Sequence, residues 1–153
     1  MVCARFLSTE AIGIIRRSRR LSLAGKGGMK LADSAAELRA RSSSTVILVT
    51  RSGMGLADEA LQHKLLNLYL KMLGENEFTP GAICFYADGV RMVLEGSPIL
   101  DLLRELEVKG VRLIICATCL KYLGLENKVA VGIIGGMNDI VLAQWMAEKV
   151  ITL

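Results

Sequence analysis

The chain has 153 residues, of which 52% are hydrophobic and 22% charged, and only two are prolines. That composition excludes a disordered or collagen-like chain and is enough for the core of one globular domain. The formal net charge of +4 arises in residues 1–30, which hold seven basic residues and one acid, so we predict no nucleic-acid partner for the rest of the chain.

Residues 1–44 are predicted to be a basic leader, which we expect to be poorly ordered, ahead of a domain over residues 45–153. The Arg- and Ser-rich composition of the leader resembles an organellar transit peptide, and its paired arginines suggest a secretory signal. The apolar run Leu21–Ala24 is too short for a signal-peptide core or a membrane span, so we exclude secretion and expect no membrane association. We favour a third interpretation, a start of translation at Met29, because Gly-Lys-Gly-Gly before a Met is what a translated ribosome-binding site looks like.

Beyond the leader, apolar runs alternate with helical patterns. A continuous apolar run predicts a buried strand over residues 45–50, and a leucine-rich stripe predicts a helix over 56–73. The further predicted elements are a strand over 81–87, a short extension or edge piece over 90–94, a helix over 97–109 capped by Ser97, strands over 111–115 and 129–134, a helix over 140–147 and a last strand over 150–153. This alternation predicts an α/β fold with a mostly parallel sheet of about five strands and helices on both faces.

The turns that follow the predicted strands form a candidate site, because ligands bind at the carboxyl ends of the strands of an open parallel sheet. These turns are Ser52–Gly55, Asp88-Gly89, Cys116–Cys119 and Gly135–Asn138. The first turn lacks the lysine of a P-loop and the third glycine of a dinucleotide fingerprint, so we favour a structural role there and expect no cofactor.

Cys116 and Cys119 lie where a run of β-branched residues meets a predicted helix. Thr118 could cap that helix, and the amides and positive end of its first turn would then favour the ionised form of the thiols. A thiolate is a nucleophile, whereas a thiol barely is one. The alternative is that both cysteines are buried and pack as small hydrophobic residues.

The spacing of the two thiols is compatible with three kinds of chemistry. A zinc site needs two further ligands, and Cys3, Cys84 and His63 are too scattered to supply them, so we expect no metal. A dithiol redox couple fits the position of Cys119, but the Trp and Pro of a thioredoxin-like motif are missing. Persulfide carriage needs one activated thiolate on a sheltered tip and leaves the second cysteine to resolve or hold the persulfide.

Several short segments occur in the order found in a known family. Among them are Gly53–Gly55, Phe85–Val90, Leu106–Val111, Cys116–Leu120 and Met137–Ile140. In these segments the chain resembles the DsrE-like sulfurtransferase family, and within it the C-terminal domain of the YedF group of sulfurtransferase-like selenium metabolism proteins.

The resemblance implies a flavodoxin-like three-layer sandwich that forms homo-oligomers. It places Cys116 where sulfur-relay relatives carry their acceptor cysteine and makes Cys119 the second cysteine of the group. The candidate binding residues come from the strand-end turns and the family segments: Gly53, Gly55, Asp88, Gly89, Thr118, Met137 and Asn138.

The chain departs from the family pattern in two ways. Ala117 replaces the glycine of the usual Cys-Gly-Thr-Cys motif. The TusA-like domain with its Cys-Pro motif, typical of the YedF group, has no counterpart, because the only prolines are Pro80 and Pro98. The sulfur donor is therefore expected to be a separate protein, either a TusA-like carrier or a cysteine desulfurase.

Three hypotheses on function stay open from the sequence. The first is a cytoplasmic sulfur carrier that accepts sulfur as a persulfide on Cys116, with Cys119 as the resolving or assisting thiol. The second is a non-catalytic oligomeric binding module, in which Cys116→Ser would leave function intact. The third is a thiol-disulfide switch, in which the two cysteines would equilibrate near cytosolic potentials.

Overall fold

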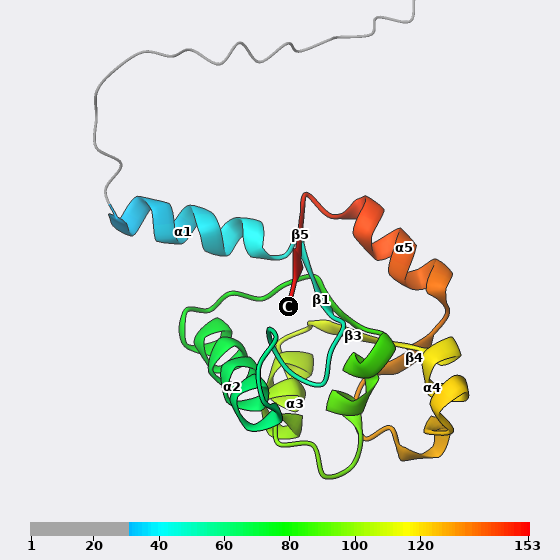
Figure 1. Ribbon diagram of the computed structural model, residues 1–153. Helices are drawn as coiled ribbons and strands as arrows, with labels where there is room; N and C mark the ends of the chain where they lie inside the picture. Colours follow the sequence, from blue (N-terminus) through cyan, green and yellow to red (C-terminus); the bar gives the residue numbers. More distant parts are fainter. Residues whose placement is uncertain (1–30) are drawn as a thin grey trace, which may run out of the picture.

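The computed structural model describes residues 31–153, and Figure 1 shows how they are arranged. The helices are α1 (Leu31–Ser42), α2 (Glu59–Glu75), α3 (Leu100–Val108), α4 (Ala117–Leu123) and α5 (Met137–Met146). The strands are β1 (Thr45–Val49), β2 (Ala82–Phe85), β3 (Arg112–Cys116), β4 (Ile133–Gly135) and β5 (Lys149–Thr152). Two 3-10 helices, η1 (Ala87–Val93) and η2 (Glu126–Lys128), complete the described elements.

The five strands form one parallel sheet in the order β4-β3-β2-β1-β5. The three inner strands are almost entirely buried, as expected for continuous apolar runs in a sheet covered on both faces. The two edge strands β4 and β5 are largely exposed. The predicted α/β fold with a parallel sheet and helices on both faces is therefore confirmed.

The topology decides which helix covers which face. The steps from β1 to β4 all run in one direction, so right-handed crossovers put α2, α3 and α4 on one face. The step from β4 to β5 runs back across the sheet and puts α5 on the other face, as Figure 1 shows for α2 and α5. The larger core cluster contains Ile47, Ile83 and Leu113 and lies on the three-helix face, whereas the smaller cluster around Cys84, Ile114 and Ile140 lies under α5.

Several predicted boundaries were wrong for local reasons. The edge piece predicted over 90–94 belongs to η1, and the helix predicted from Ser97 begins at Leu100 with Ile99 as its N-cap. Strand β4 is shorter than predicted. Helix α5 begins earlier, because the Asp139 carboxylate accepts the Gly136 N–H at 2.7 Å and thereby fixes its first turn.

Part of the predicted leader is helical. Residues 31–42 form α1, whose last residue Ser42 bonds through its hydroxyl to the Arg39 carbonyl (2.7 Å) and accepts the Thr79 N–H (3.1 Å). This links the end of α1 to the segment before β2. The interpretations of residues 1–30 concern residues outside those described. No helix over residues 31–153 is long and apolar enough to cross a membrane.

Candidate functional site

Cys116 ends β3 on the face that α5 covers. Its partner across the sheet is Gly135 of β4, and its side chain belongs to the smaller core cluster together with Ile140 and Ala143. Its exposed fraction is 0%. The expectation that this thiol is reachable at the tip of the strand is therefore wrong for this structure: Cys116 points inward because it shares the face of Ile114, two residues earlier.

Cys119 is the more accessible of the two thiols. It lies in the first turn of α4, is partly exposed, and packs against both core clusters. Its Sγ accepts a hydrogen bond from the backbone N–H of Ala87 at 3.1 Å. Ala87 has a positive φ of 50°, a conformation that costs a non-glycine residue energy and that aims its N–H at the sulfur.

The electrostatics of Cys119 differ from the sequence expectation. Its burial raises the pKa of the thiol, the Ala87 N–H lowers it, and the neighbouring Cys116 thiol raises it again, with a net upward direction. The predicted ionisation of the thiols is thus not found for Cys119. The predicted cap is also wrong, because Cys116 is the N-cap of α4 and Thr118 lies inside the helix, exposed.

The two thiols are neighbours without being bonded to each other. Cys116 and Cys119 are both free, and the Cys116 thiol is near enough to Cys119 to raise its pKa. Cys84 is a third free cysteine, buried in the core, and burial raises its pKa to about 11. Over residues 31–153 no group of three or more His, Cys, Asp or Glu side chains is placed to hold a metal.

The parallel sheet brings the four predicted turns to one edge, but not all of their residues face the thiols. Asp88 is exposed and pairs with Arg91 at 3.4 Å. Gly89 is buried against the end of β1, where a Cβ would overlap the Val49 carbonyl. These contacts give Asp88 and Gly89 a structural role in the turn.

The remaining predicted binding residues lie in the outer turns of this edge. Gly53 packs its backbone against Gln62 of α2, and Gly55 is exposed. Met137 and Asn138 are exposed at the start of α5, which follows the β4 residue that pairs with Cys116. The structure thus joins the β2, β3 and β4 turns around the thiols and gives the β1 turn a packing role.

Two residues of the site were not singled out from the sequence. Ala87 contributes its backbone N–H, and a backbone group cannot be recognised from the residue type. Tyr86 is half-buried and packs on the same small core cluster as Cys119. The sequence pointed to this turn through its position after a predicted strand and through the family segment Phe85–Val90, but not to these two residues.

Comparison with known proteins gives one family and a set of similar folds. A sequence model of the DsrE/DsrF-like family matches residues 43–153. The crystal structure of the ychN protein from E. coli is similar with a TM-score of 0.53 and 16% identity, over 71% of this chain and 98% of that one. The protein of unknown function MTH1491 from Methanobacterium thermoautotrophicum is similar with a TM-score of 0.53 and 21% identity, over 71% of this chain and 97% of that one. The search of curated proteins gave no match.

Proposed function

The chain belongs to the DsrE/DsrF-like family, and on that premise we propose that it is a carrier in a cytoplasmic sulfur relay. The observation that carries the proposal is the pair of free, neighbouring thiols at the β3–α4 junction, of which one is sealed and one is partly open. Because a donor protein can only reach an open thiol, we assign the acceptor role to Cys119 and the assisting role to Cys116. This reverses the roles that the family resemblance implied.

The transfer step needs no net oxidant or reductant. Cys119 loses its proton, and its thiolate attacks the outer sulfur of a donor persulfide, R–S–SH. The donor S–S bond breaks, a new S–S bond forms at Cys119, and the proton passes to the departing donor thiolate. The products are R–SH and Cys119–S–SH, and the Ala87 N–H stabilises the negative sulfur during the attack.

Cys116 then acts on the loaded site from the protein interior. Its thiol lies beside Cys119 and is shielded from solvent, so it can hydrogen-bond to the carried group without competing for donor proteins. Attack of a Cys116 thiolate on the Cys119 sulfur would release the carried sulfur as hydrogen sulfide and leave a disulfide between the two. A slow loss of this kind is expected when no acceptor is present.

Because the pKa of Cys119 is raised, we propose that the donor protein helps to ionise its thiol. An ordinary cysteine with a pKa near 8.5 is only about 3% thiolate at pH 7, and Cys119 is less ionised than that. We infer that docking of a donor protein, a TusA-like carrier or a cysteine desulfurase, supplies the base or positive charge that completes ionisation. The same Cys-x-Thr-Cys spacing supports a place in the YedF group, including its link to selenium.

An exposed apolar surface supports a homo-oligomer. It is made by β4 and α5, and its large side chains are 43% to 85% exposed: Ile133, Ile134, Met137, Val141, Leu142, Trp145 and Met146. Contiguous apolar surfaces of this kind mark protein interfaces. Since β4 pairs with β3 at Cys116, an interface here would border the thiol site.

The test is loading of the full chain with sulfur, read by intact-protein mass spectrometry. The protein is incubated with a cysteine desulfurase and cysteine, and Cys119→Ala is compared with Cys116→Ala and with the matched core control Cys84→Ala. We expect wild type and Cys84→Ala to gain the mass of one sulfur atom, Cys116→Ala to load and hold it longer, and Cys119→Ala to gain none. Equal loading of all three variants would contradict the carrier proposal and favour the non-catalytic binding module.

A further inference from the structure

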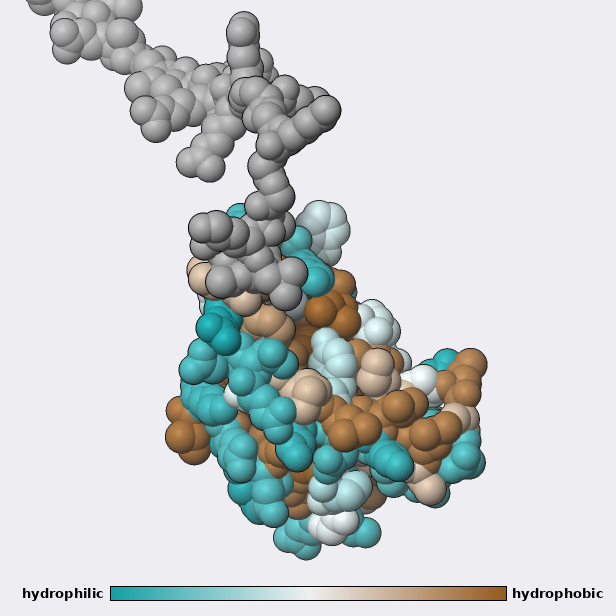
Figure 2. All heavy atoms as spheres, turned by 90° about the vertical axis from the view of Figure 1, so that its left-hand side faces the viewer, coloured by the Kyte–Doolittle hydropathy of each residue, from teal (hydrophilic) through white to brown (hydrophobic). Residues whose placement is uncertain are grey.

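A cavity lies at the opposite end of the sheet from the thiols. It is bordered by α1, α2 and the starts of β1 and β5, is partly open to solvent, and has a volume of about 530 Å³. Figure 2 views the side that carries α1 and α2, where apolar residues (brown) are exposed among polar ones (teal). Cavities of several hundred Å³ with mostly apolar walls are typical of small-molecule sites.

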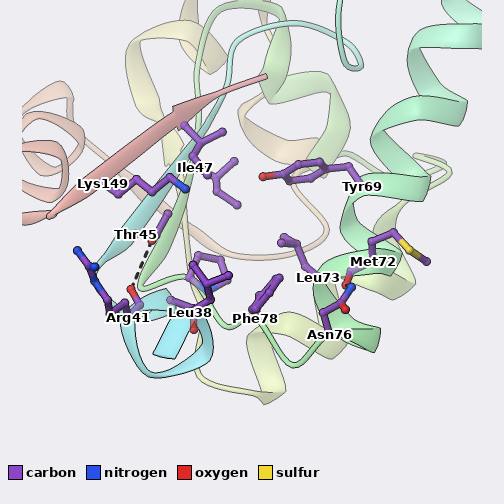
Figure 3. Close-up of a pocket in the computed structure, with 13 residues that line it drawn as sticks. Leu38, Arg41, Thr45, Ile47, Tyr69, Met72, Leu73, Asn76, Phe78 and Lys149 are labelled. Carbon is purple, nitrogen blue, oxygen red and sulfur yellow. Dashed lines mark hydrogen bonds between the residues drawn. The ribbon is translucent and has the colours of Figure 1, made fainter. Parts of the chain in front are cut away.

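The walls of this cavity are apolar on three sides. Ile47 and Ile151 form the floor on the sheet, Met72 and Leu73 come from α2, and Leu38 comes from α1. Figure 3 shows these elements around the space, with Phe78 closing it next to Leu73. Such walls fit an alkyl chain or an aromatic ring better than a sugar or a nucleotide.

Two polar groups point into the cavity and have no partner among the described residues. In Figure 3 the ammonium of Lys149 and the hydroxyl of Tyr69 are both directed into the space beside Ile47. Among residues 31–153, the Tyr69 hydroxyl makes no hydrogen bond, and Lys149 forms no ion pair. Tyr69 is half-buried, and desolvation raises its pKa, so its hydroxyl stays a donor at neutral pH.

The charged residues at the rim of the cavity indicate what charge a bound ligand would have. Arg41 and Lys149 line the cavity, and the one acid paired with either is Glu148, whose carboxylate lies 3.8 Å from Arg41 in the described part of the chain. That pair is exposed on both sides and therefore weak. The rim is left with one net positive charge, which complements a monoanion and not a phosphate dianion.

From this combination we propose that the cavity binds a free carboxylic acid with an apolar chain, such as a medium-chain fatty acid. The carboxylate accepts hydrogen bonds from Lys149 and Tyr69, and the chain packs between α1 and α2. The site is independent of the sulfur chemistry, because it lies at the amino ends of the strands. Because the ligand contacts both α1 and α2, its binding stabilises the packing of α1 on the rest of the domain.

The test uses the full chain and decanoate below its micelle concentration, followed by isothermal titration calorimetry. We expect one saturable site per chain, with decanol and decyltrimethylammonium at least tenfold weaker. Tyr69→Phe removes the hydroxyl and Lys149→Gln replaces the ammonium by a shorter, neutral amide. Each should weaken decanoate binding roughly tenfold, the effect of losing one hydrogen bond to a charged group. Lys71→Gln, which removes a positive charge elsewhere on α2, is the matched control and should change nothing.

Four results would overturn the proposal. One is the absence of saturable decanoate binding, and the second is equal binding of decanol, which would mean that the anion is not recognised. The third is unchanged affinity in both Tyr69→Phe and Lys149→Gln while circular dichroism shows both to be folded. An equal loss in Lys71→Gln would likewise place the binding on general surface charge and not in the cavity.

Discussion

Replacing Gly89 by alanine tests how the β2 turn is held next to the thiols. Gly89 lies against the end of β1, and a Cβ there would overlap the Val49 carbonyl oxygen and come within 2.6 Å of its carbon. Both contacts are to backbone, which cannot rotate away as a side chain can. The turn must therefore move off β1.

The cost can be worked out from two contributions. Forcing an extra carbon into a packed site costs about 1 to 3 kcal/mol. Moving the turn also loosens the hydrogen bond from the Tyr86 N–H to the Val49 carbonyl (3.2 Å), which contributes about 1 kcal/mol. Together we expect Gly89→Ala to lower the free energy of unfolding by about 3 kcal/mol.

Urea unfolding followed by circular dichroism measures this loss. Gly96→Ala is the matched control, because its φ of 84° strains an alanine but its Cβ would meet no atom within 4 Å, so it should cost only about 1 kcal/mol. The displaced turn also carries the Ala87 N–H away from Cys119, so the pH at which Cys119 becomes reactive should rise in Gly89→Ala. Similar losses for the two variants, or an unchanged pH profile of Cys119, would refute this account of the turn.

Three further predictions concern the thiols and the apolar surface. Iodoacetamide should alkylate native Cys119 first, with a rate that is still rising above pH 8.5 because its pKa is raised, whereas buried Cys116 should react only as the protein opens; faster reaction of Cys116 would contradict the assignment. The pKa of Cys84, about 11, lies above its ordinary value, so ionisation of this thiol lowers the free energy of unfolding as pH rises from about 9 towards 11. In urea unfolding, Cys84→Ala should show a smaller loss of stability over this pH range than wild type. An equal loss in the two proteins would contradict this prediction. Trp145→Glu should shift the chain to smaller species in analytical ultracentrifugation, while Leu56→Glu, at a similarly exposed residue in the loop before α2, should not. A monomeric wild type would contradict the proposed homo-oligomer.

The architecture could be predicted because burial on both faces leaves a signature in the sequence. Residues 46–49 and 113–116 are apolar without interruption, which a strand exposed on one face would not need. The alternation of such runs with helical stripes then left few topologies. The junction that carries Cys116 and Cys119 was found for the same reason.

The finer features depend on contacts that the sequence pattern does not encode. Cys116 is buried because its side chain shares the face of Ile114, which α5 covers, and the position of α5 follows from the reversal between β4 and β5. The positive φ of Ala87 could not be predicted from its residue type, because residues other than glycine rarely adopt it. Helix α1 was missed because it directly follows the basic residues 1–30, and the contact that links its Ser42 to the domain lies 37 residues away at Thr79.

The most direct measurement is to locate the carried sulfur on the chain. After incubation with a persulfide donor, the native protein is trapped with an alkylating reagent, digested and mapped by tandem mass spectrometry. The account predicts the extra sulfur on Cys119, with Cys116 of the same chain recovered as a free thiol. Chains that have lost the sulfur should instead contain a disulfide between Cys116 and Cys119. Extra sulfur on Cys116 alone, or on neither cysteine, would contradict it.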